Sequence, residues 1–192
     1  MKKVLVFGMT DNPGGMESVI MNYYRHIDRS VLQFEFLCNT EKVAYEDEIR
    51  KLGGVIHNIC ARSKNLKQYK HDMKDFFENN ADKYCALWFN TCSLSNIDYL
   101  LYAKKYHIHK RIIHCHNAAN GGDSFLRNLL HKYHQRKVFK YATDFWTCNQ
   151  DSDLWFFGKA SEELPNYRVI YNAIDLDYLA PSDEVRNDYR SK

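Results

Sequence analysis

The hydrophobic positions of the chain alternate between short continuous runs and helical spacing. The first run, residues 3–7, is almost wholly apolar and ends at Gly8, as expected of a parallel strand covered on both faces. Apolar residues then recur at intervals of three and four over residues 16–27, which predicts an amphipathic helix. Gly14 and Gly15 precede this spacing directly, so we expect the double glycine at a helix N-terminus.

The same alternation continues to the end of the chain. Further strands are predicted at residues 34–38, 55–60, 86–89, 111–116, 144–148 and 168–171. Further helices are predicted at residues 44–52, 66–77, 97–101, 124–141 and 151–157. Strands and helices in this order predict an α/β fold with right-handed crossovers, a Rossmann-like, doubly wound and mostly parallel sheet between two helical layers.

Ligands bind such sheets at the carboxyl ends of the strands, so the candidate site residues are those that follow strands directly. They are Gly14, Gly15, Met16, Glu17, Asn90, Thr91, His116, Asn117 and Asn172.

Composition narrows the class of protein. The 192 residues are 45% hydrophobic, enough for one domain with a sizeable core. The net charge of +3 is too mild to indicate a nucleic-acid partner. No run reaches the length of a membrane span, and a polar turn stands where a signal peptide would have its cleavage site, so we expect a cytoplasmic protein. The six cysteines form no C-x-x-C pair, a pattern typical of free thiols in a reducing compartment.

The double glycine matches neither standard phosphate fingerprint. A dinucleotide turn reads G-x-G-x-x-G and a P-loop ends in Gly-Lys-Ser/Thr, whereas Gly15 is followed by Met16 and Glu17. A helix N-terminus can still bind an anion through its backbone N–H groups. The alternative is a structural turn, in which the glycines serve a positive φ or close helix–sheet packing.

His114 and His116 are two residues apart on a predicted strand and therefore share a face. Together with Cys115 they resemble the start of a metal site, but zinc needs a third protein ligand and nothing nearby has ligand spacing, so no metal is predicted. We expect His114 in the core and His116 at the cleft. A neutral His116 could hydrogen-bond a sugar hydroxyl, and a charged one could bind a phosphate.

The predicted helix 124–141 is basic and contains no acidic residue. Its cations are Arg127, Lys132, Arg136, Lys137 and Lys140, and beside them lie Phe125, Leu126, Leu129, Leu130, Tyr133 and Val138. We expect the apolar residues to pack on the sheet; the alternative is a basic edge that contacts an anionic membrane.

Four stretches carry a family resemblance. They are GGMES after the first strand, IIHCHN at 112–117, TCNQDSDLWFFG at 147–158 and RVIYNAIDLDYLAP at 168–181. In this order they resemble the N-terminal half of the GT-B retaining glycosyltransferases that build bacterial capsular and exopolysaccharides. Ala173 departs from that pattern, where the family usually has glycine, and so does Asn149, where serine often follows the strand.

The resemblance implies an organisation and an activity. Residues 1–174 would form the acceptor-side domain, and residues 175–192 would lead into a C-terminal domain that holds most of the nucleotide-sugar donor, so the 192-residue chain alone would be inactive. The glycine turn would approach the donor diphosphate, and His116 would contact the transferring sugar or the acceptor. The reaction implied is transfer to a saccharide or lipid-linked hydroxyl with retention, without cofactor or obligatory metal.

Two other classes share the predicted fold. An NAD-dependent nucleotide-sugar epimerase or dehydrogenase would need a dinucleotide turn and an acidic residue after the second strand, where this chain has Cys38, Asn39 and Thr40. A non-catalytic Rossmann-like binding domain is the other alternative, and nothing in the sequence argues against it.

Overall fold

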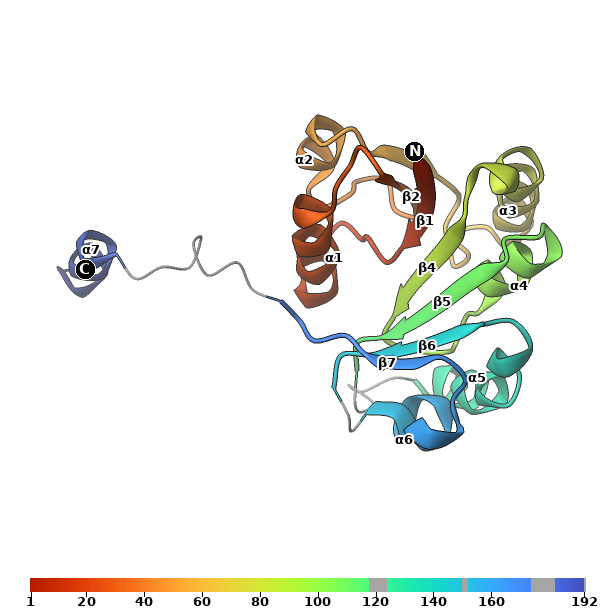
Figure 1. Ribbon diagram of the computed structural model, residues 1–192. Coiled ribbons are helices and arrows are strands. Elements are labelled where there is room, and N and C mark those ends of the chain that lie inside the picture. Colours follow the sequence, from red (N-terminus) through yellow and green to blue (C-terminus); the bar gives the residue numbers. More distant parts are fainter. Residues whose placement is uncertain (118–123, 150–151, 174–181, 192) are drawn as a thin grey trace.

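A computed structural model describes residues 1–117, 124–149, 152–173 and 182–191. Within these ranges every predicted strand is present, and all pair in parallel in one seven-stranded sheet of order β3-β2-β1-β4-β5-β6-β7 (Figure 1). The strands are β1 (Lys2–Phe7), β2 (Leu32–Cys38), β3 (Val55–Asn58), β4 (Ala86–Thr91), β5 (Lys110–Cys115), β6 (Asp144–Thr147) and β7 (Tyr167–Val169).

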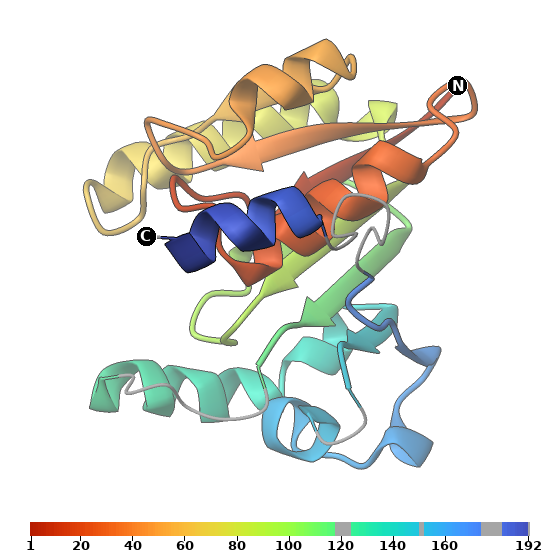
Figure 2. The ribbon, with the colours of Figure 1, turned by 90° about the vertical axis from the view of Figure 1, so that its left-hand side faces the viewer.

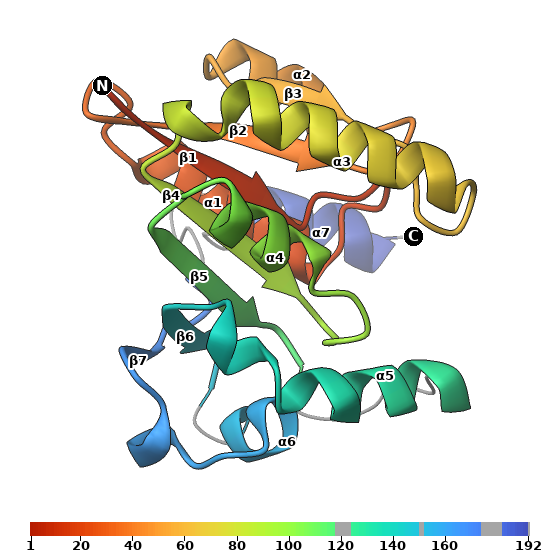
Figure 3. The ribbon, with the colours of Figure 1, turned by 90° about the vertical axis from the view of Figure 1, so that its right-hand side faces the viewer.

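Helices cover both faces of the sheet. They are α1 (Gly15–His26), α2 (Glu46–Lys51), α3 (Leu66–Asn80), α4 (Asp98–Lys105), α5 (Phe125–Gln135) and α6 (Ser152–Phe157), with 3₁₀ turns η1 (Ala81–Lys83), η2 (Val138–Lys140) and η3 (Ser161–Glu163). A further helix, α7 (Asp183–Ser191), stands apart from the sheet (Figure 1). Figures 1 and 3 show α1 and α2 on one face and α3, α4 and α5 on the other. The predicted three-layer architecture is thus confirmed.

Alternate residues of the central strands enter two separate cores. On β1, Val4 and Val6 pack towards α1, whereas Leu5 packs into the larger core under α3 and α4. Because the strand is buried on both faces, its sequence is a continuous apolar run instead of an alternating one.

The strand order places a switch point between β1 and β4. The chain builds outwards from β1 through β2 to β3, and then returns to the other side of β1 with β4. The connections that leave β1 and β4 therefore run to opposite faces of the sheet, α1 on one and α4 on the other (Figures 2 and 3). A crevice between diverging connections is where doubly wound sheets bind ligands.

Three predictions about helices need correction. The predicted helix 124–141 ends as an α-helix at Gln135 and continues only as the turn η2. Most of its apolar side chains do not pack on the sheet: Phe125, Leu126, Leu129 and Tyr133 are exposed, and Val138 is buried. No helix was predicted at 183–191, where α7 forms. In the part of the chain that is described, no helix is long and apolar enough to cross a membrane.

Candidate functional site

The site begins at Gly8, where the fold requires glycine. Its φ is +136°, a conformation that side chains other than glycine rarely adopt. A Cβ at this position would lie 2.7 Å from Asn90 Cβ and 3.0 Å from Ile20 Cδ1. Gly8 thus lets the ends of β1 and β4 and the helix α1 come close together.

The double glycine starts α1 but has no such conformational role. Gly14 is the N-cap, with φ −81° and ψ −170°, and Gly15 is the first helical residue, also outside the left-handed region. The alternative explanation, in which the glycines serve a positive φ, therefore holds at neither position. A Cβ on Gly14 would lie 3.0 Å from Glu17 Oε2, whereas a Cβ on Gly15 would meet no atom within 4 Å. The first-turn N–H groups of a helix have no intrahelical partner, so α1 presents donors at an open end.

Glu17 borders these donors. It is buried, and its Oε1 accepts a hydrogen bond of 2.6 Å from Thr10 Oγ1. A carboxylate in the first turn is stabilised by the helix dipole, but it repels a phosphate. Of the predicted residues in this turn, Glu17 is thus suited to accept a hydrogen bond from a hydroxyl, and the N–H groups of Gly15 and Met16 are suited to an anion.

Asn90 links the strand ends to His116. Its side chain is fully buried, and Nδ2 donates to Phe7 O at 3.1 Å and to Trp88 O at 3.4 Å. Carbonyl oxygens only accept, so these bonds fix the orientation of the amide. Its Oδ1 then faces His116 Nε2 at 2.9 Å and accepts from it.

His116 is therefore the Nε2–H tautomer, with the lone pair on Nδ1. Its backbone N–H donates to Thr91 O at 3.2 Å, which places the residue at the tip of β5. Burial lowers the pKa of His116 to about 4, so the ring is neutral at pH 7. At that pH the ring does not carry the positive charge that binding a phosphate would require. Its Nδ1 can instead accept a hydrogen bond from a hydroxyl.

His114 is a core residue, as predicted. It is fully buried, and its Nδ1 accepts a hydrogen bond of 3.3 Å from Trp88 Nε1. Burial lowers the pKa of its ring to about 2. No group of three histidine, cysteine or acidic residues that could hold a metal ion occurs among the described residues.

The other candidates are positioned less directly. Thr91 Oγ1 donates to Ser93 O at 2.8 Å and shapes the turn after β4. The carbonyl of Asn117 accepts from Cys115 Sγ at 2.9 Å. Thr91 is the last residue of β4 and Asn117 follows β5, so both share the carboxyl edge with His116.

Asn172 is separated from the glycine turn. The carbonyls on either side of it are held by α1: Tyr23 Oη donates to Tyr171 O at 3.0 Å, and Asn22 Nδ2 donates to Ala173 O at 2.6 Å. Asn22 is seven residues beyond Gly15, which is about 10 Å along the helix axis. These two hydrogen bonds could not be predicted from the sequence, because Tyr23 fits the apolar stripe of α1 and Asn22 belongs to no recognisable pattern.

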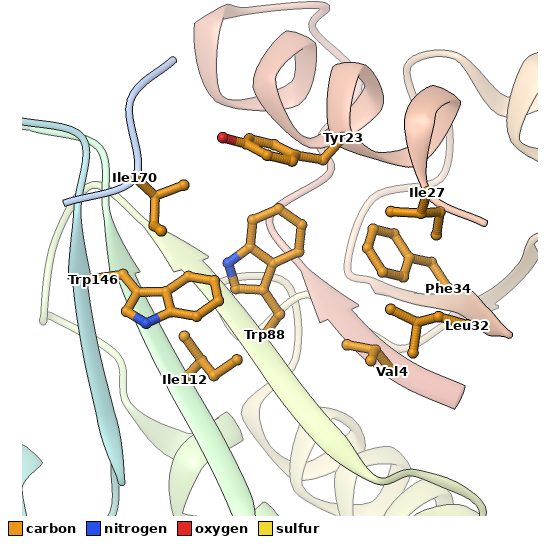
Figure 4. Close-up of a pocket in the computed structure, with 9 residues that line it drawn as sticks. All are labelled: Val4, Tyr23, Ile27, Leu32, Phe34, Trp88, Ile112, Trp146 and Ile170. Carbon is orange, nitrogen blue, oxygen red and sulfur yellow. The ribbon is translucent and has the colours of Figure 1, made fainter. Parts of the chain in front are cut away.

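An apolar hollow of about 280 Å³ lies between α1 and the sheet. Figure 4 shows Trp88 and Trp146 between Tyr23 on α1 and Ile112 on β5, with Ile170 at one side. Its lining is almost wholly apolar and includes Val4 and Leu32, near the amino ends of their strands. The hollow therefore has neither the chemistry nor the position of the site at the carboxyl edge.

Comparison with known proteins shows which proteins this chain resembles in sequence and in fold. No family model matches the sequence. EpsF of Bacillus subtilis (strain 168), assigned as a glycosyltransferase, is 26% identical over 193 residues, which is 99% of this chain and 50% of EpsF. HepE of Anabaena, solved with UDP and glucose, superposes with a TM-score of 0.70 at 16% identity, over 100% of this chain and 50% of HepE. The chain has the fold of one half of a GT-B glycosyltransferase.

This GT-B half spans about half the length of the relatives it matches. The UDP-GlcNAc 2-epimerase of Methanocaldococcus jannaschii has a similar fold, with a TM-score of 0.56 at 11% identity, over 100% of this chain and 53% of the epimerase. The same fold thus occurs in proteins with different reactions, and the fold alone does not identify the reaction.

Proposed function

We propose that this chain is the acceptor-side part of a glycosyltransferase that makes cell-surface polysaccharide. The enzyme would transfer a hexose from a nucleotide sugar to a saccharide or lipid-linked hydroxyl, with retention. Residues 1–174 would form the acceptor-side domain, and residues 175–192 would connect it to a donor-binding domain. The relation to EpsF along nearly the whole chain and the UDP and glucose held by HepE support this proposal.

The open N-terminus of α1 is the observation on which the proposal rests. Gly15 has an ordinary helical conformation, and a Cβ added to it would meet no atom within 4 Å. Neither strain nor packing among the described residues therefore explains a glycine there. A ligand that approaches the backbone would explain it. Helix N-termini bind diphosphates in this way, because their N–H groups and the dipole converge on the anion.

Backbone and side-chain groups near this end would contact different parts of the two substrates. The N–H groups of Gly15 and Met16 would stabilise the negative charge that develops on the departing diphosphate. Neutral His116, through Nδ1, and Glu17 would accept hydrogen bonds from hydroxyls of the transferring sugar or the acceptor. His116 would orient the hydroxyl more than remove its proton, because a ring with a pKa of about 4 is a weak base.

The isolated chain should bind a nucleotide sugar weakly and should not transfer it. A helix N-terminus contributes roughly 0.3–1 kcal/mol at an exposed site, whereas a micromolar ligand requires about 8 kcal/mol. The remaining contacts would come from the donor-binding domain. Micromolar binding of a nucleotide sugar by residues 1–192 alone, measured by calorimetry, would contradict this division of the site.

The test of the proposal is a graded pair of substitutions in the full-length protein, Gly15→Ala and Gly15→Val. Because a Cβ at Gly15 meets nothing, alanine should leave the melting temperature unchanged or slightly raised. Donor affinity should fall by about tenfold with alanine and further with valine, as the side chain obstructs the phosphate. Unchanged donor affinity in both variants would refute the role of this turn.

His116→Ala tests the second half of the site. We expect turnover to fall by about two orders of magnitude with the fold intact, the scale of losing one positioned group. The products distinguish the possible functions: a new glycosidic bond identifies a transferase, an inverted sugar carbon identifies an epimerase, and tight binding without product identifies a binding domain.

A further inference from the structure

Four side chains lie in a row on one face of the sheet at the carboxyl ends of β4 and β5. Trp88 and Asn90 are alternate residues of β4; His114 lies on β5, and His116 follows it with the same spacing. Alternate residues of a strand point to one face, and Trp88 lies in the core on the α1 side. Asn90 and His114 are partners in the strand register. The fold thus places a buried amide beside both histidines.

The two ends of the Asn90 amide have different tasks. Nδ2 donates to Phe7 O at 3.1 Å and to Trp88 O at 3.4 Å, so the nitrogen joins the end of β1 to β4. Gly8 makes room for this side chain, because a Cβ at Gly8 would lie 2.7 Å from Asn90 Cβ. None of these contacts uses the amide oxygen. Oδ1 instead lies 2.9 Å from His116 Nε2.

His114 supports the ring of His116 from a second direction. The centroids of the two rings are 4.3 Å apart. His114 is fixed in turn, because its Nδ1 accepts a hydrogen bond of 3.3 Å from Trp88 Nε1. The ring of His116 is therefore held with Nε2 towards the amide of Asn90, and only Nδ1 is left for a ligand.

We propose that Asn90 is a positioning residue, which acts on the substrate through His116 by restricting His116 Nδ1 to ligand groups that donate a hydrogen bond. Its place near the end of β4 predicted direct binding, but Asn90 is fully buried and cannot touch a substrate. A sugar hydroxyl can donate to Nδ1, whereas a diphosphate oxygen without a proton cannot. The amide thereby directs the hydroxyl to His116 and leaves the anion to the N-terminus of α1.

Removal of the amide oxygen would remove this selectivity. Without an acceptor beside Nε2, the neutral ring of His116 can carry its proton on either nitrogen. A ring with the proton on Nδ1 donates instead of accepting, so a bound hydroxyl loses its partner. The role in turnover rests on the proposed function, whereas the position of the proton does not.

Nitrogen-15 NMR of residues 1–192 with labelled histidine tests the position of the proton without any substrate. The spectrum of His116→Gln identifies the signals of His116. In the wild type at pH 7 the ring should be neutral, with its proton on Nε2. A form with the proton on Nδ1 should appear in Asn90→Ala but not in Asn90→Asp, which keeps an oxygen beside Nε2. The control is Asn96→Ala, because Asn96 also follows β4 but donates to Tyr69 Oη at 3.2 Å and should leave His116 unchanged.

Turnover of the full-length protein tests whether Asn90 acts through His116. Asn90→Ala should lower turnover by about tenfold, the scale of one misdirected hydrogen bond. In the His116→Ala background the same substitution should have no further effect on turnover, because no ring remains to be positioned. Its effect on the melting temperature should be similar in both backgrounds, since the carbonyls of Phe7 and Trp88 lose their donor in each. Asn90→Asp should retain more turnover than Asn90→Ala, and Asn96→Ala should change turnover equally in both backgrounds.

Three results would overturn the proposal. They are a wild-type His116 that is charged or carries its proton on Nδ1, an unchanged proton position in Asn90→Ala, and an equal loss of turnover from Asn90→Ala with and without His116. Should Asn90→Ala not fold, the wild-type and Asn90→Asp spectra still decide, because a proton on Nδ1 in either contradicts the proposal. A full-length protein without transferase activity would contradict the proposed function, while the NMR result would stand, so the two fail separately.

Discussion

The buried ring of His114 should make the protein sensitive to mild acid, by an amount that the structure allows us to calculate. His114 is fully buried, with its ring centroid 5.9 Å from those of both Trp88 and Trp146. Its pKa is lowered to about 2, whereas an unfolded histidine titrates near 6.5. Below about pH 6.5 the unfolded chain therefore binds a proton that the folded chain excludes.

The sign and size of the effect follow from this difference. A group that binds protons more readily when unfolded makes the free energy of unfolding fall as the pH falls, beginning near the unfolded pKa and ending near the folded one. From about pH 7.5 to about pH 5, His114 alone should lower the free energy of unfolding by about 2 kcal/mol. His116 acts in the same direction, and its effect is smaller because the residue is partly exposed.

Urea unfolding of the wild type and His114→Gln at both pH values measures this contribution. Glutamine does not titrate, and its packing cost is present at both pH values, so that cost cancels in the difference. The loss of stability on acidification should be about 2 kcal/mol smaller in His114→Gln. His109→Gln is the control for replacing a histidine, because His109 is exposed. An equal loss in wild type and His114→Gln would refute the assignment of a neutral buried ring.

Two further predictions concern stability. Gly8→Ala should lower the free energy of unfolding by about 3 kcal/mol, because it combines a strained φ with a Cβ 2.7 Å from Asn90; a melting temperature equal to that of Gly15→Ala would contradict this. Glu35→Gln should cost about 2 kcal/mol at pH 7, since Lys3 Nζ, His57 Nε2 and Tyr84 Oη surround the carboxylate at 2.6–2.8 Å. Burial alone would raise the pKa of Glu35, but these contacts lower it to about 2. The difference in free energy of unfolding between Glu35→Gln and wild type should therefore shrink as the pH falls from about 4.5 towards 2. The control Glu41→Gln, at a side chain 87% exposed, should stay close to wild type throughout.

The order of strands and α-helices from β1 to β7 could be predicted from the sequence. A strand buried on both faces has to be apolar throughout, and α1 has to repeat every three to four residues to cover it, so both patterns are legible in residues 3–27. The outer face of α5 could not be predicted in the same way. Periodicity places Leu126, Leu129 and Tyr133 on one stripe, but it does not say on which side the protein lies. The hydrogen bonds of His131 and His134 with Leu94, nearly 40 residues earlier in the chain, determine which side of α5 faces the protein.

The sequence predicts where the candidate site residues lie in the fold better than it predicts their protonation and hydrogen bonds. Parallel topology brings the residues after β1, β4 and β5 to one edge, which follows from the order of the elements. The protonation of His116 does not follow from it. The ring nitrogen that carries the proton is set by Asn90, 26 residues away, and the orientation of Asn90 is set in turn by the carbonyls of Phe7 and Trp88.

The glycines after β1 show how a structural residue and a candidate binding residue can be distinguished. At Gly8 the backbone conformation and two contacts closer than ordinary packing each require the absence of a side chain, so the fold alone accounts for that glycine. At Gly15 neither reason applies: the conformation is helical and the space is empty, and alanine there would favour the helix. A glycine that lowers helix stability, and that the fold does not require, is expected where a ligand has to approach the backbone. On the proposed function, the group that approaches the backbone at Gly15 is the diphosphate of a nucleotide sugar.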